Sequence, residues 1–486
     1  MILAALLEAV VGVKSVNGAW DSIFQLTFDP ASQVLAYGFQ RAITSDPLGN
    51  LHVAWLDQRT VPYQIWYRKF DRRAGMWLPE TMLTSRPVNC FPPSVAGDGQ
   101  GNVHLAWHME SRPCLGLWYK RYDAALGRWR PDTLLDTTGA SRLLRLPAVA
   151  ARSGAAEVHI VWFGYSDTGN VYQVFHKEFR PDSGWRPTEQ VTSANCSHEQ
   201  ATVAVDSAGD LCVVWLGLDL GGSCAQVYCR RRVEGVWQDV ELVSDFANPW
   251  TQSSPCVAAG PNGTWHVVWH GRQGIQTYQA VYHRLRTPEG WSGIWAVSGA
   301  VEHQQENPSV ACRQGNECHV VWEGMTDLSP ATRQVLYAYR SSAGYWSLPQ
   351  QLTNRTQGDI RRPSIATDPD SGLHLVWHDA SSGNLDVFYL HGWTSGTGIN
   401  DGGSATKHRF GQTILFGPRS RLVFRLKDDG PMQLTVMTTT GRIVLRQKIS
   451  GSGDRVVGLS QLPPGVYLAR LASPNRSAIE KLVLLR

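Results

Sequence analysis

Seven copies of a short run ending in tryptophan recur along this chain at a nearly constant period. The run is His-x-x-Trp in six copies and Cys-x-x-Trp in the fourth. Its tryptophans are Trp55, Trp107, Trp162, Trp215, Trp269, Trp322 and Trp377, which lie 52, 55, 53, 54, 53 and 55 residues apart. Self-similarity at a period of roughly 20–50 residues is typical of propellers and other repeat arrays. The chain is therefore expected to fold as seven copies of one unit, although its 486 residues alone would suggest several separate domains.

Each repeat contains the same elements in the same order. A Pro-x-Val/Ile-Ala run, as in 93–96, is followed by a turn, the His-x-x-Trp run, a variable loop, a third apolar run such as 65–67 and a Gly-x-Trp turn. These runs are rich in Val, Ile, Trp and Tyr and are bounded by Gly, Asp or Pro, which is typical of short strands. Four-stranded units at this spacing predict the blades of a seven-bladed β-propeller.

The seventh repeat lacks its last strand, and a matching piece stands at the other end of the chain. Six repeats carry a second tryptophan 22 to 24 residues after the first, whereas Trp393 follows Trp377 by only 16. Trp20 precedes Thr27 by the same seven residues that separate Trp346 from Thr353. We therefore expect residues 20–27 to pair with the third strand of the last blade, near 387–390, and to close the ring. Closure removes the open sheet edges that invite aggregation.

The predicted fold class is all-β: a seven-bladed β-propeller closed by an N-terminal strand and followed by a small C-terminal β-sandwich. The propeller is predicted over residues 18–393, a Gly/Ser-rich linker over 394–408 and the sandwich over 409–486. Residues 1–13 are apolar, but Glu8 interrupts them and no basic segment precedes them. Residues 1–17 are accordingly interpreted either as a remnant signal segment or as a stray N-terminal strand.

Charge and hydropathy argue against two classes of partner. Lysine and arginine number 45 and aspartate and glutamate 41, a net charge of +4 that is too small and too scattered to favour nucleic acid. No apolar stretch has the length of a transmembrane helix, so no transmembrane segment is expected.

The end of the chain carries two motifs that differ from the repeat. Residues 438–442 read Thr-Thr-Thr-Gly-Arg, 459–467 read Leu-Ser-Gln-Leu-Pro-Pro-Gly-Val-Tyr, and the chain ends Lys-Leu-Val-Leu-Leu-Arg. This segment resembles the type A C-terminal sorting domain of type IX secretion, although the usual Asn-Pro-aromatic opening is absent. The resemblance implies that residues 409–486 engage the type IX secretion machinery. It also implies a protein that is secreted or held on the outer-membrane surface of a Gram-negative bacterium. The alternative is a generic β-sandwich accessory domain.

The nine cysteines bear on the compartment. Cys90 and Cys114 fall in the loop entering the second repeat and in the loop after its core tryptophan, and Cys196 and Cys224 repeat this arrangement in the fourth. Cys312 and Cys318 flank a tight turn. We therefore predict disulfides Cys90–Cys114, Cys196–Cys224 and Cys312–Cys318, which would fit an oxidising compartment. The alternative is that all nine are reduced core residues.

The repeated histidines invite a metal interpretation that strand geometry opposes. In pairs such as His104/His108 the residues are four apart, which on a strand separates them by about 13 Å. Both members cannot then bind one zinc ion at its short ligand distances. No metal and no cofactor are expected, no catalytic residue is assigned, and the histidines are interpreted as structural.

The variable loops are the expected location of function. Polar and aromatic residues there should point to one end of the ring and suit a glycan or another polar polymer; the alternative is a solvated rim without a ligand. The candidate ligand-binding residues are Asp57, Arg59, Arg112, Tyr165, Trp250, His270, Arg272, Glu323, Arg362, His378 and Asp379.

The Gly-x-Trp turn, as in 123–129, is similar to a degenerate Asp-box, and through it the blades resemble the BNR-repeat, sialidase-like propellers of secreted bacterial proteins. Arg41, in Arg41-Ala42-Ile43, is similar to their Arg-Ile-Pro motif. Seven repeats instead of six and the lack of a nucleophile pair weigh against sialidase activity. We therefore favour a secreted, monomeric, non-catalytic propeller that binds carbohydrate, with a sialidase-like exo-glycoside hydrolase as the alternative.

Overall fold

The computed structural model describes the propeller region over residues 19–393, apart from 113, 137–143, 166–170, 194, 219–223, 246–248, 275, 300, 314–315 and 328. The C-terminal region is described through seven strands between 413 and 485. The predicted signal segment 1–17 and linker 394–408 lie outside the described residues. Trp20–Trp393 form one compact unit.

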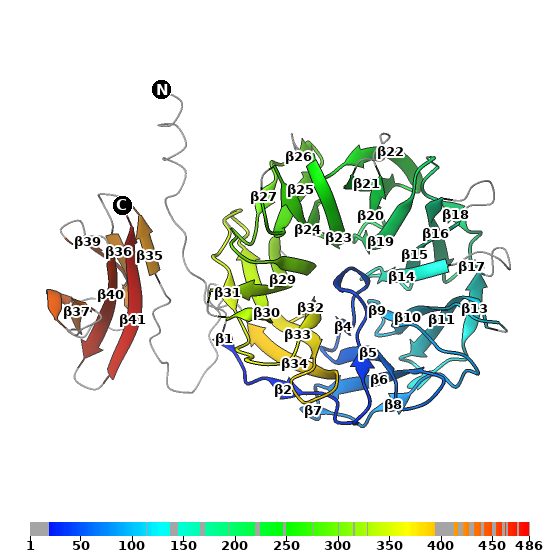
Figure 1. Cartoon of the computed structure of the whole chain (residues 1–486), viewed down its shortest axis with the longest axis horizontal. Coiled ribbons are helices and arrows are strands. Elements are labelled where there is room, and N and C mark those ends of the chain that lie inside the picture. Colours follow the sequence, from blue (N-terminus) through cyan, green and yellow to red (C-terminus); the bar gives the residue numbers. More distant parts are fainter. Residues whose placement is uncertain are drawn as a thin grey trace. The chain divides into compact units, whose positions relative to one another are not determined.

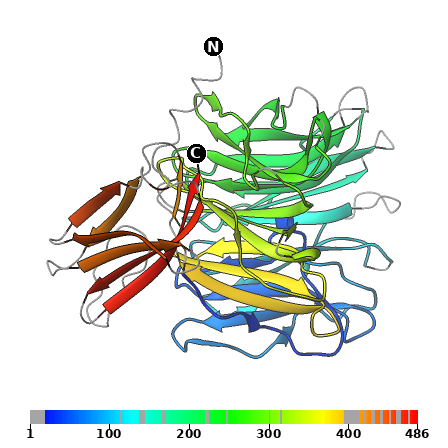
Figure 2. The ribbon, with the colours of Figure 1, turned by 60° about the vertical axis from the view of Figure 1, so that its left-hand side comes forward.

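Seven antiparallel sheets form a ring (Figure 1), which confirms the predicted seven-bladed β-propeller. In the oblique view of Figure 2 the sheets of neighbouring blades lie face to face. We number the blades 1 to 7 by the order of their core tryptophans.

The innermost strands of blades 1 to 7 line the centre of the ring: β3 (Gln33–Val34) with β4 (Ile43–Ser45), β9 (Ser94–Gly97), β14 (Leu144–Ala151), β19 (His198–Val205), β23 (Pro249–Ala259), β28 (Gln305–Arg313) and β32 (Arg361–Thr367). The second strands carry the core tryptophans: β5 (Leu51–Asp57), β10 (Val103–Met109), β15 (Val158–Tyr165), β20 (Leu211–Leu218), β24 (Trp265–Gln273), β29 (Glu317–Thr326) and β33 (Gly372–Asp379).

The third strands follow the variable loops: β6 (Gln64–Asp71), β11 (Gly116–Asp123), β16 (Tyr172–Arg180), β21 (Ala225–Val233), β25 (Ala280–Thr287), β30 (Ser329–Arg340) and β34 (Asp386–Trp393). The outer strands of blades 1 to 6 are short and often split in two: β7 (Met76–Trp77) and β8 (Thr81–Met82), β12 (Arg128–Trp129) and β13 (Thr133–Asp136), β17 (Gly184–Trp185) and β18 (Glu189–Gln190), β22 (Val236–Leu242), β26 (Gly290–Trp291) and β27 (Trp295–Ala296), and β31 (Gln350–Gln351).

Repeated side chains hold each blade together and join it to the next. All seven core tryptophans are at most 1% exposed. The preceding histidine bonds through Nδ1 to a tyrosine or histidine of the third strand in six blades, at 2.6–3.2 Å. At six blade interfaces that same ring receives, edge-on, the outer-strand tryptophan of the following blade, with centroids 4.9–5.6 Å apart. The repeated residues are therefore mainly packing residues. Because both faces of each sheet are buried, apolar and polar residues do not alternate along the second strands.

The N-terminal segment supplies the outer strand of blade 7, as predicted. In β2 (Phe24–Gln25), Phe24 pairs with Tyr389 and Gln25 with Phe388 of β34, and β1 (Ala19–Trp20) lies farther along the same strand. The Oγ1 of Thr27 accepts the Val387 N–H at 2.9 Å, just as Thr353 accepts the Val335 N–H in blade 6. The seven-residue spacing from tryptophan to threonine thus reflects a shared hydrogen bond.

A feature that the sequence did not reveal closes the centre of the ring. The short 3-10 helix η1 (Gly38–Gln40), between β3 and β4, sits among the innermost strands (Figure 1, dark blue). Gln40 donates to the Pro147 carbonyl, the Phe39 carbonyl accepts from Thr202, and the Gly38 carbonyl accepts from Cys256. A Cβ on Gly38 would lie 3.0 Å from the Pro308 carbonyl oxygen and 3.2 Å from that of Pro363, so a larger residue would require these backbones to shift. We call residues 37–41 the plug, because they bond to strands of blades 3, 4 and 5 and press against blade 6.

The C-terminal strands form two sheets, in agreement with the predicted small sandwich. One is ordered β35 (Thr413–Phe416), β41 (Arg476–Leu485), β40 (Gly465–Ser473), β37 (Met432–Thr438) and β38 (Ile443–Ile449), and the other pairs β36 (Arg421–Leu426) with β39 (Gly453–Gly458). Leu434 and Val436 of β37 are fully buried and Thr435 between them is nearly so, which places this strand in the core of the larger sheet.

The predicted disulfides are not formed in the structure. No disulfide is found among the described residues, which include all nine cysteines. Cys90 and Cys114 lie in one apolar cluster, and Cys312 and Cys318 face each other across β28 and β29. The bridges Cys90–Cys114 and Cys196–Cys224 therefore stay predictions, and the third pair is taken up under the further inference.

Candidate functional site

The loops that follow the core tryptophans and the loops that join successive blades lie at one end of the ring. The Cys90 N–H in the loop entering blade 2 donates to the carbonyl of Tyr63 in the variable loop of blade 1. At blade 6 the side chain of Gln334 on β30 donates to the carbonyl of Arg355 in the loop entering blade 7. We call this end the loop face, and the rim of the plugged channel on it the mouth.

The mouth is shaped by a bulge in the innermost strand of five blades. The pairing shifts register there, and the bulged residue has a positive φ of 47° to 52°. These residues are Leu146, Gln200, Ser254, Asn307 and Arg362. A positive φ is costly for a side chain other than glycine and is retained where the surroundings impose it, often at functional positions. At Ser254, Asn307 and Arg362 the backbone N–H of the bulged residue donates to a side chain of the preceding blade.

A continuous hydrogen-bond chain runs around the mouth through these bulges. The Asn307 N–H donates to Nδ1 of His270 at 3.1 Å, and the Asn307 amide donates to Glu323 at 3.0 Å. The Arg362 N–H donates to the other oxygen of Glu323 at 2.6 Å, while its guanidinium donates to the Leu35 carbonyl at 2.8 Å. The Leu35 N–H in turn donates to Nδ1 of His378 at 3.1 Å. The chain thus links blades 5, 6, 7 and 1.

A carboxylate–arginine cluster stands beside this chain on blades 6 and 7. Glu323 is fully buried, with Arg361 at 3.3 Å and Arg333 at 3.8 Å from its carboxylate. Arg333 also pairs with Glu306 at 2.9 Å, and Asp359 pairs with Arg361 at 2.6 Å. Each arginine therefore already has more than one carboxylate partner, and the side chain of Arg361, 37% exposed, is the most accessible.

Burial sets the protonation of the groups behind the mouth. Burial raises the pKa of Glu323, although hydrogen bonds from Arg362 and Asn307 and the nearby arginines oppose this. Burial lowers the pKa of His270 to about 4 and that of His378 to about 3, so both rings are neutral near pH 7. A neutral ring accepts the backbone N–H that each receives, which makes these histidines acceptors between blades.

Arg362 also covers the plug. Its guanidinium lies 3.8 Å from the ring centroid of Tyr37, which stacks on Phe39 at 5.4 Å. Arg41, at the other end of the plug, donates to the Val257 carbonyl at 2.5 Å. Arg41 resembles a sialidase motif in sequence, but in the structure its guanidinium bonds to the backbone of blade 5 and not to a ligand position at the mouth.

Of the predicted residues, His270, Glu323, Arg362 and His378 belong to the chain around the mouth. Asp57 and Asp379 are fully buried and accept the indole N–H of the core tryptophans of their own strands, at 2.9 Å and 3.3 Å. Arg59 pairs with Asp57 at 2.7 Å and stacks on Trp66, so it stabilises the blade 1 loop.

The remaining predicted residues lie elsewhere on the loop face. Tyr165 stacks on Tyr172 at 4.4 Å at the end of blade 3, Arg112 is exposed in the variable loop of blade 2, and Arg272 is half-buried near the end of β24. The side chain of Trp250 lies outside the described residues. The sequence did not single out Gln200, Ser254, Asn307 or Arg333. Its only signal was the proline that directly follows Ser254, Asn307 and Arg362.

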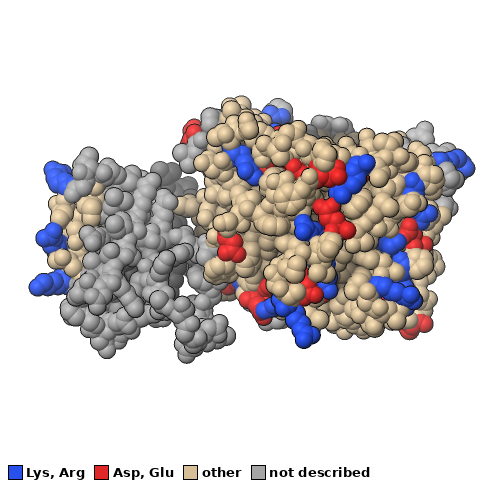
Figure 3. Space-filling model, turned by 90° about the horizontal axis from the view of Figure 1, so that it is seen from below, with Lys and Arg blue, Asp and Glu red and all other residues tan. Residues whose placement is uncertain are grey.

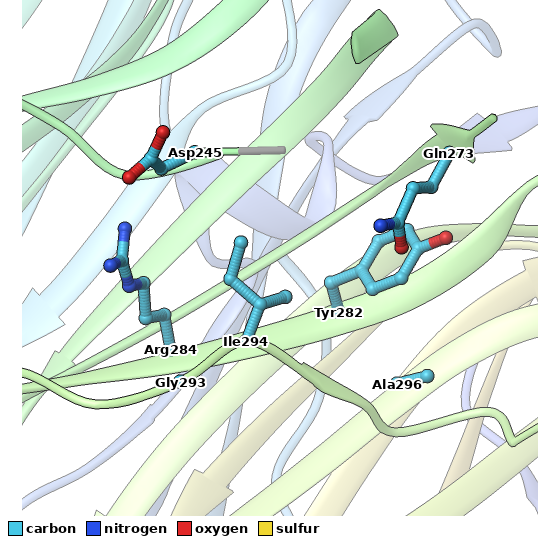
Figure 4. A pocket seen from close by; sticks show the side chains of 7 residues that line it. All are labelled: Asp245, Gln273, Tyr282, Arg284, Gly293, Ile294 and Ala296. Carbon is cyan, nitrogen blue, oxygen red and sulfur yellow. The ribbon is translucent and has the colours of Figure 1, made fainter. Parts of the chain in front are cut away.

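A groove of about 310 Å³ lies away from the mouth, beside the outer part of blade 5 (Figure 4). Figure 4 shows Arg284 and Asp245 along one side and Gln273 and Tyr282 along the other. Arg284 already donates to the carbonyls of Val243 and Ser292, at 2.9 Å and 2.8 Å. The groove is thus a surface recess whose main donor is occupied by backbone.

The surface charges are mixed. On the side of the propeller shown in Figure 3, basic and acidic side chains alternate without a broad patch of either sign. No helix among the described residues is long and apolar enough to cross a membrane.

Comparisons with known proteins identify the tail and the fold. Residues 420–485 match the secretion system C-terminal sorting domain. The chain has no match among curated proteins. Among solved structures, that of the polysaccharide lyase Uly1 is similar with a TM-score of 0.50 at 10% identity, over 81% of this chain and 95% of that one.

Two further solved structures align at lower scores. The α-L-arabinanase of Penicillium chrysogenum aligns with a TM-score of 0.43 at 11% identity, over 76% of this chain and 98% of that one. The leech intramolecular trans-sialidase aligns with a TM-score of 0.41 at 9% identity, over 78% and 70%. At such identities the likeness concerns the fold alone.

The fold and the tail together define an exported β-propeller protein. A C-terminal sorting domain marks the chain for type IX secretion, so the protein is secreted or held at the cell surface.

Proposed function

We propose that the propeller binds a glycan or a similar polar polymer at the mouth, without catalysing a reaction on it. The observation that carries the proposal is the hydrogen-bond chain through Asn307, Glu323 and Arg362, built on bulged residues with positive φ. The plug beneath it gives the mouth a closed floor, so a ligand would rest on the ring instead of entering it. Sugar hydroxyls need donors and acceptors side by side, and amide, carboxylate and guanidinium groups supply both.

The carboxylate–arginine cluster supports binding more than hydrolysis. Hydrolysis by two carboxylates requires one to remain a free nucleophile or base and the other to act as acid across a single sugar. Glu323 is fully buried and bonded to Arg362 and Asn307, and Glu306 is paired with Arg333. The alternative function, a sialidase-like exo-glycoside hydrolase, is favoured by the guanidinium groups of Arg333 and Arg361 beside Glu323, because an anionic sugar binds to such groups.

The test is a glycan-array screen of the full chain, followed by affinity measurements on the hits. Arg361→Ala removes the most accessible arginine of the cluster and is expected to weaken binding at least tenfold, whereas Arg361→Lys should retain part of it. Arg128→Ala is the matched control, because Arg128 is an exposed arginine on an outer strand at the opposite end of the ring. Equal affinity of Arg361→Ala and Arg128→Ala would contradict the proposal.

Chromogenic glycosides and intact polysaccharides assayed with the same variants separate binding from catalysis. Turnover that is lost in Arg361→Ala but kept in Arg128→Ala would favour the hydrolase alternative. Binding without turnover would support the non-catalytic function.

A further inference from the structure

The interface between blades 5 and 6 departs from the repeat at its histidine. In blades 1, 2 and 7 the repeated histidine bonds through Nε2 to the aspartate of its own turn, at 3.2 Å in each case. That aspartate is absent from the turns of blades 3 and 6 as well, and in blade 5 Gly260 takes its place. The Nε2 of His266 instead lies 2.7 Å from the Oδ1 of Asn316, which belongs to the β28–β29 hairpin of blade 6. His266 is thereby turned toward the neighbouring blade without a carboxylate partner.

Two thiols stand on that same hairpin where no other repeat has one. Cys312 and Cys318 are paired in register on β28 and β29. The position of Cys318, directly before the repeated histidine, is apolar in every other blade: Leu51, Val103, Val158, Leu211, Trp265 and Leu373. The position of Cys312 is held by Ser45, Gly97, Ala151, Val205, Ala259 and Thr367. The other six blades therefore fold without a thiol at either position.

The three side chains meet between the blades. A ring nitrogen of His266, the Sγ of Cys312 and the Sγ of Cys318 all lie within 4.8 Å of one another. Cys318 is fully buried and packs in the same cluster as Cys256 and Val268 of blade 5, so it faces that blade. Two thiolates and one imidazole form a borderline-soft ligand set that suits zinc in tetrahedral geometry.

We propose that His266, Cys312 and Cys318 bind one zinc ion that joins blade 5 to blade 6. His266 would coordinate through Nε2, because its Nδ1 lies 3.0 Å from the Nε2 of His283. A ligating histidine commonly donates its second ring N–H to such an acceptor, which fixes its tautomer and orientation. The Asn316 amide oxygen beside Nε2 is the nearest candidate for the fourth ligand, and a water molecule is the alternative.

This site is independent of the mouth. The β28–β29 hairpin lies at the end of the blade opposite the loop face, so the ion would stabilise the ring and take no part in glycan binding. It also replaces the disulfide predicted for Cys312–Cys318, because a bridged pair has no thiolates left to coordinate metal. The two states are mutually exclusive and can be told apart chemically.

The experiment measures metal bound to the full chain prepared with zinc under reducing conditions. Elemental analysis after removal of free metal should give one zinc per chain, and cobalt substitution should give a thiolate-to-cobalt charge-transfer band. Both signals should be lost in Cys312→Ser and in His266→Gln. They should persist in Cys196→Ser, a thiol outside this interface, and in His319→Gln, which changes the equivalent histidine of the next blade.

Thermal melts by tryptophan fluorescence verify that each variant is folded, and zinc should raise the melting temperature of the unmodified chain but not that of Cys312→Ser. Zinc contents that do not differ between the ligand variants and the two controls would overturn the proposal. So would peptide mapping of the exported protein that finds Cys312 bridged to Cys318.

Discussion

The closing strand can be tested by comparing two leucines that occupy the same place in different blades. Leu26 of the N-terminal segment donates its N–H to the Val387 carbonyl at 2.7 Å, and Leu83 of blade 1 donates to the Ile65 carbonyl at 2.8 Å. Leu26 is 0% exposed and Leu83 is 7% exposed. The structural equivalence predicts that Leu26→Ala and Leu83→Ala destabilise the propeller by similar amounts, although one residue is near a chain end and the other lies inside the chain.

The expected magnitude follows from burial. Truncating a fully buried leucine to alanine removes its transfer free energy and leaves a cavity, which together cost about 2–5 kcal/mol. Leu26 packs with Val53 and Trp55 of blade 1 as well as Val387 of blade 7, so its loss loosens the seam where the ring closes. Phe24→Ala on the same segment should cost much less, because Phe24 is 41% exposed.

Denaturant unfolding followed by tryptophan fluorescence is the assay. All 20 tryptophans lie between Trp20 and Trp393, so the signal reports the propeller and not the C-terminal sandwich. A chain lacking residues 1–27 should unfold at lower denaturant than Leu26→Ala. The closure would be refuted if Leu83→Ala lost the expected stability while Leu26→Ala unfolded like the unmodified chain.

Three further outcomes are expected. A chain truncated after Trp393 should melt like the full propeller by fluorescence, yet accumulate in the periplasm of its native cell, and normal export would disprove the sorting role of the tail. Peptide mapping of exported protein without reductant should find Cys90 bridged to Cys114, a loop closure worth about 3 kcal/mol, and free thiols at both would exclude it. Burial lowers the pKa of His319 and of His378 to about 3. As the pH falls below about 6.5, these two histidines therefore become protonated in the unfolded chain while they remain neutral in the folded chain. Stability should be complete above that pH and decline toward pH 4, by about 1.4 kcal/mol per pH unit for each histidine. His319→Gln should flatten this decline, and an unchanged slope would contradict the assignment.

The ring was predictable because its contacts are repeated. Six blade interfaces reuse one histidine, one third-strand aromatic and one outer-strand tryptophan, so repetition of one sequence pattern specifies nearly the whole ring. Blade 4 departs from the pattern, because Cys212 stands in place of the histidine. The closing strand was predictable for the same reason, since Trp20 and Thr27 reproduce the contacts of Trp346 and Thr353. Periodicity carries this information without any knowledge of tertiary structure.

The mouth was only partly predictable because it depends on what is not repeated. The plug occurs once, between β3 and β4, and its residues follow no period. Asn307 and Arg362 adopt positive φ, which sequence reasoning assigns mainly to glycine. Their conformation arises from register shifts in β28 and β32 that depend on neighbouring blades. His270, Glu323 and His378 were predicted as site residues because each directly follows a core tryptophan. Their role as buried hydrogen-bond acceptors could not be predicted, because the donors come from other blades.

Positions that depart from the repeat are the positions at which we expect functional residues in this chain. A position that every blade fills alike is committed to packing, as with the core tryptophans and their third-strand partners. Gly260, Cys312 and Cys318 break that rule together at one interface, and Asn307, Glu323 and Arg362 do so together at the mouth. Other departures, such as Cys212 in place of the repeated histidine in blade 4, lie in neither group. We propose that these two clusters, at opposite ends of the blades, serve two separate tasks, one that holds the ring together and one that meets a ligand.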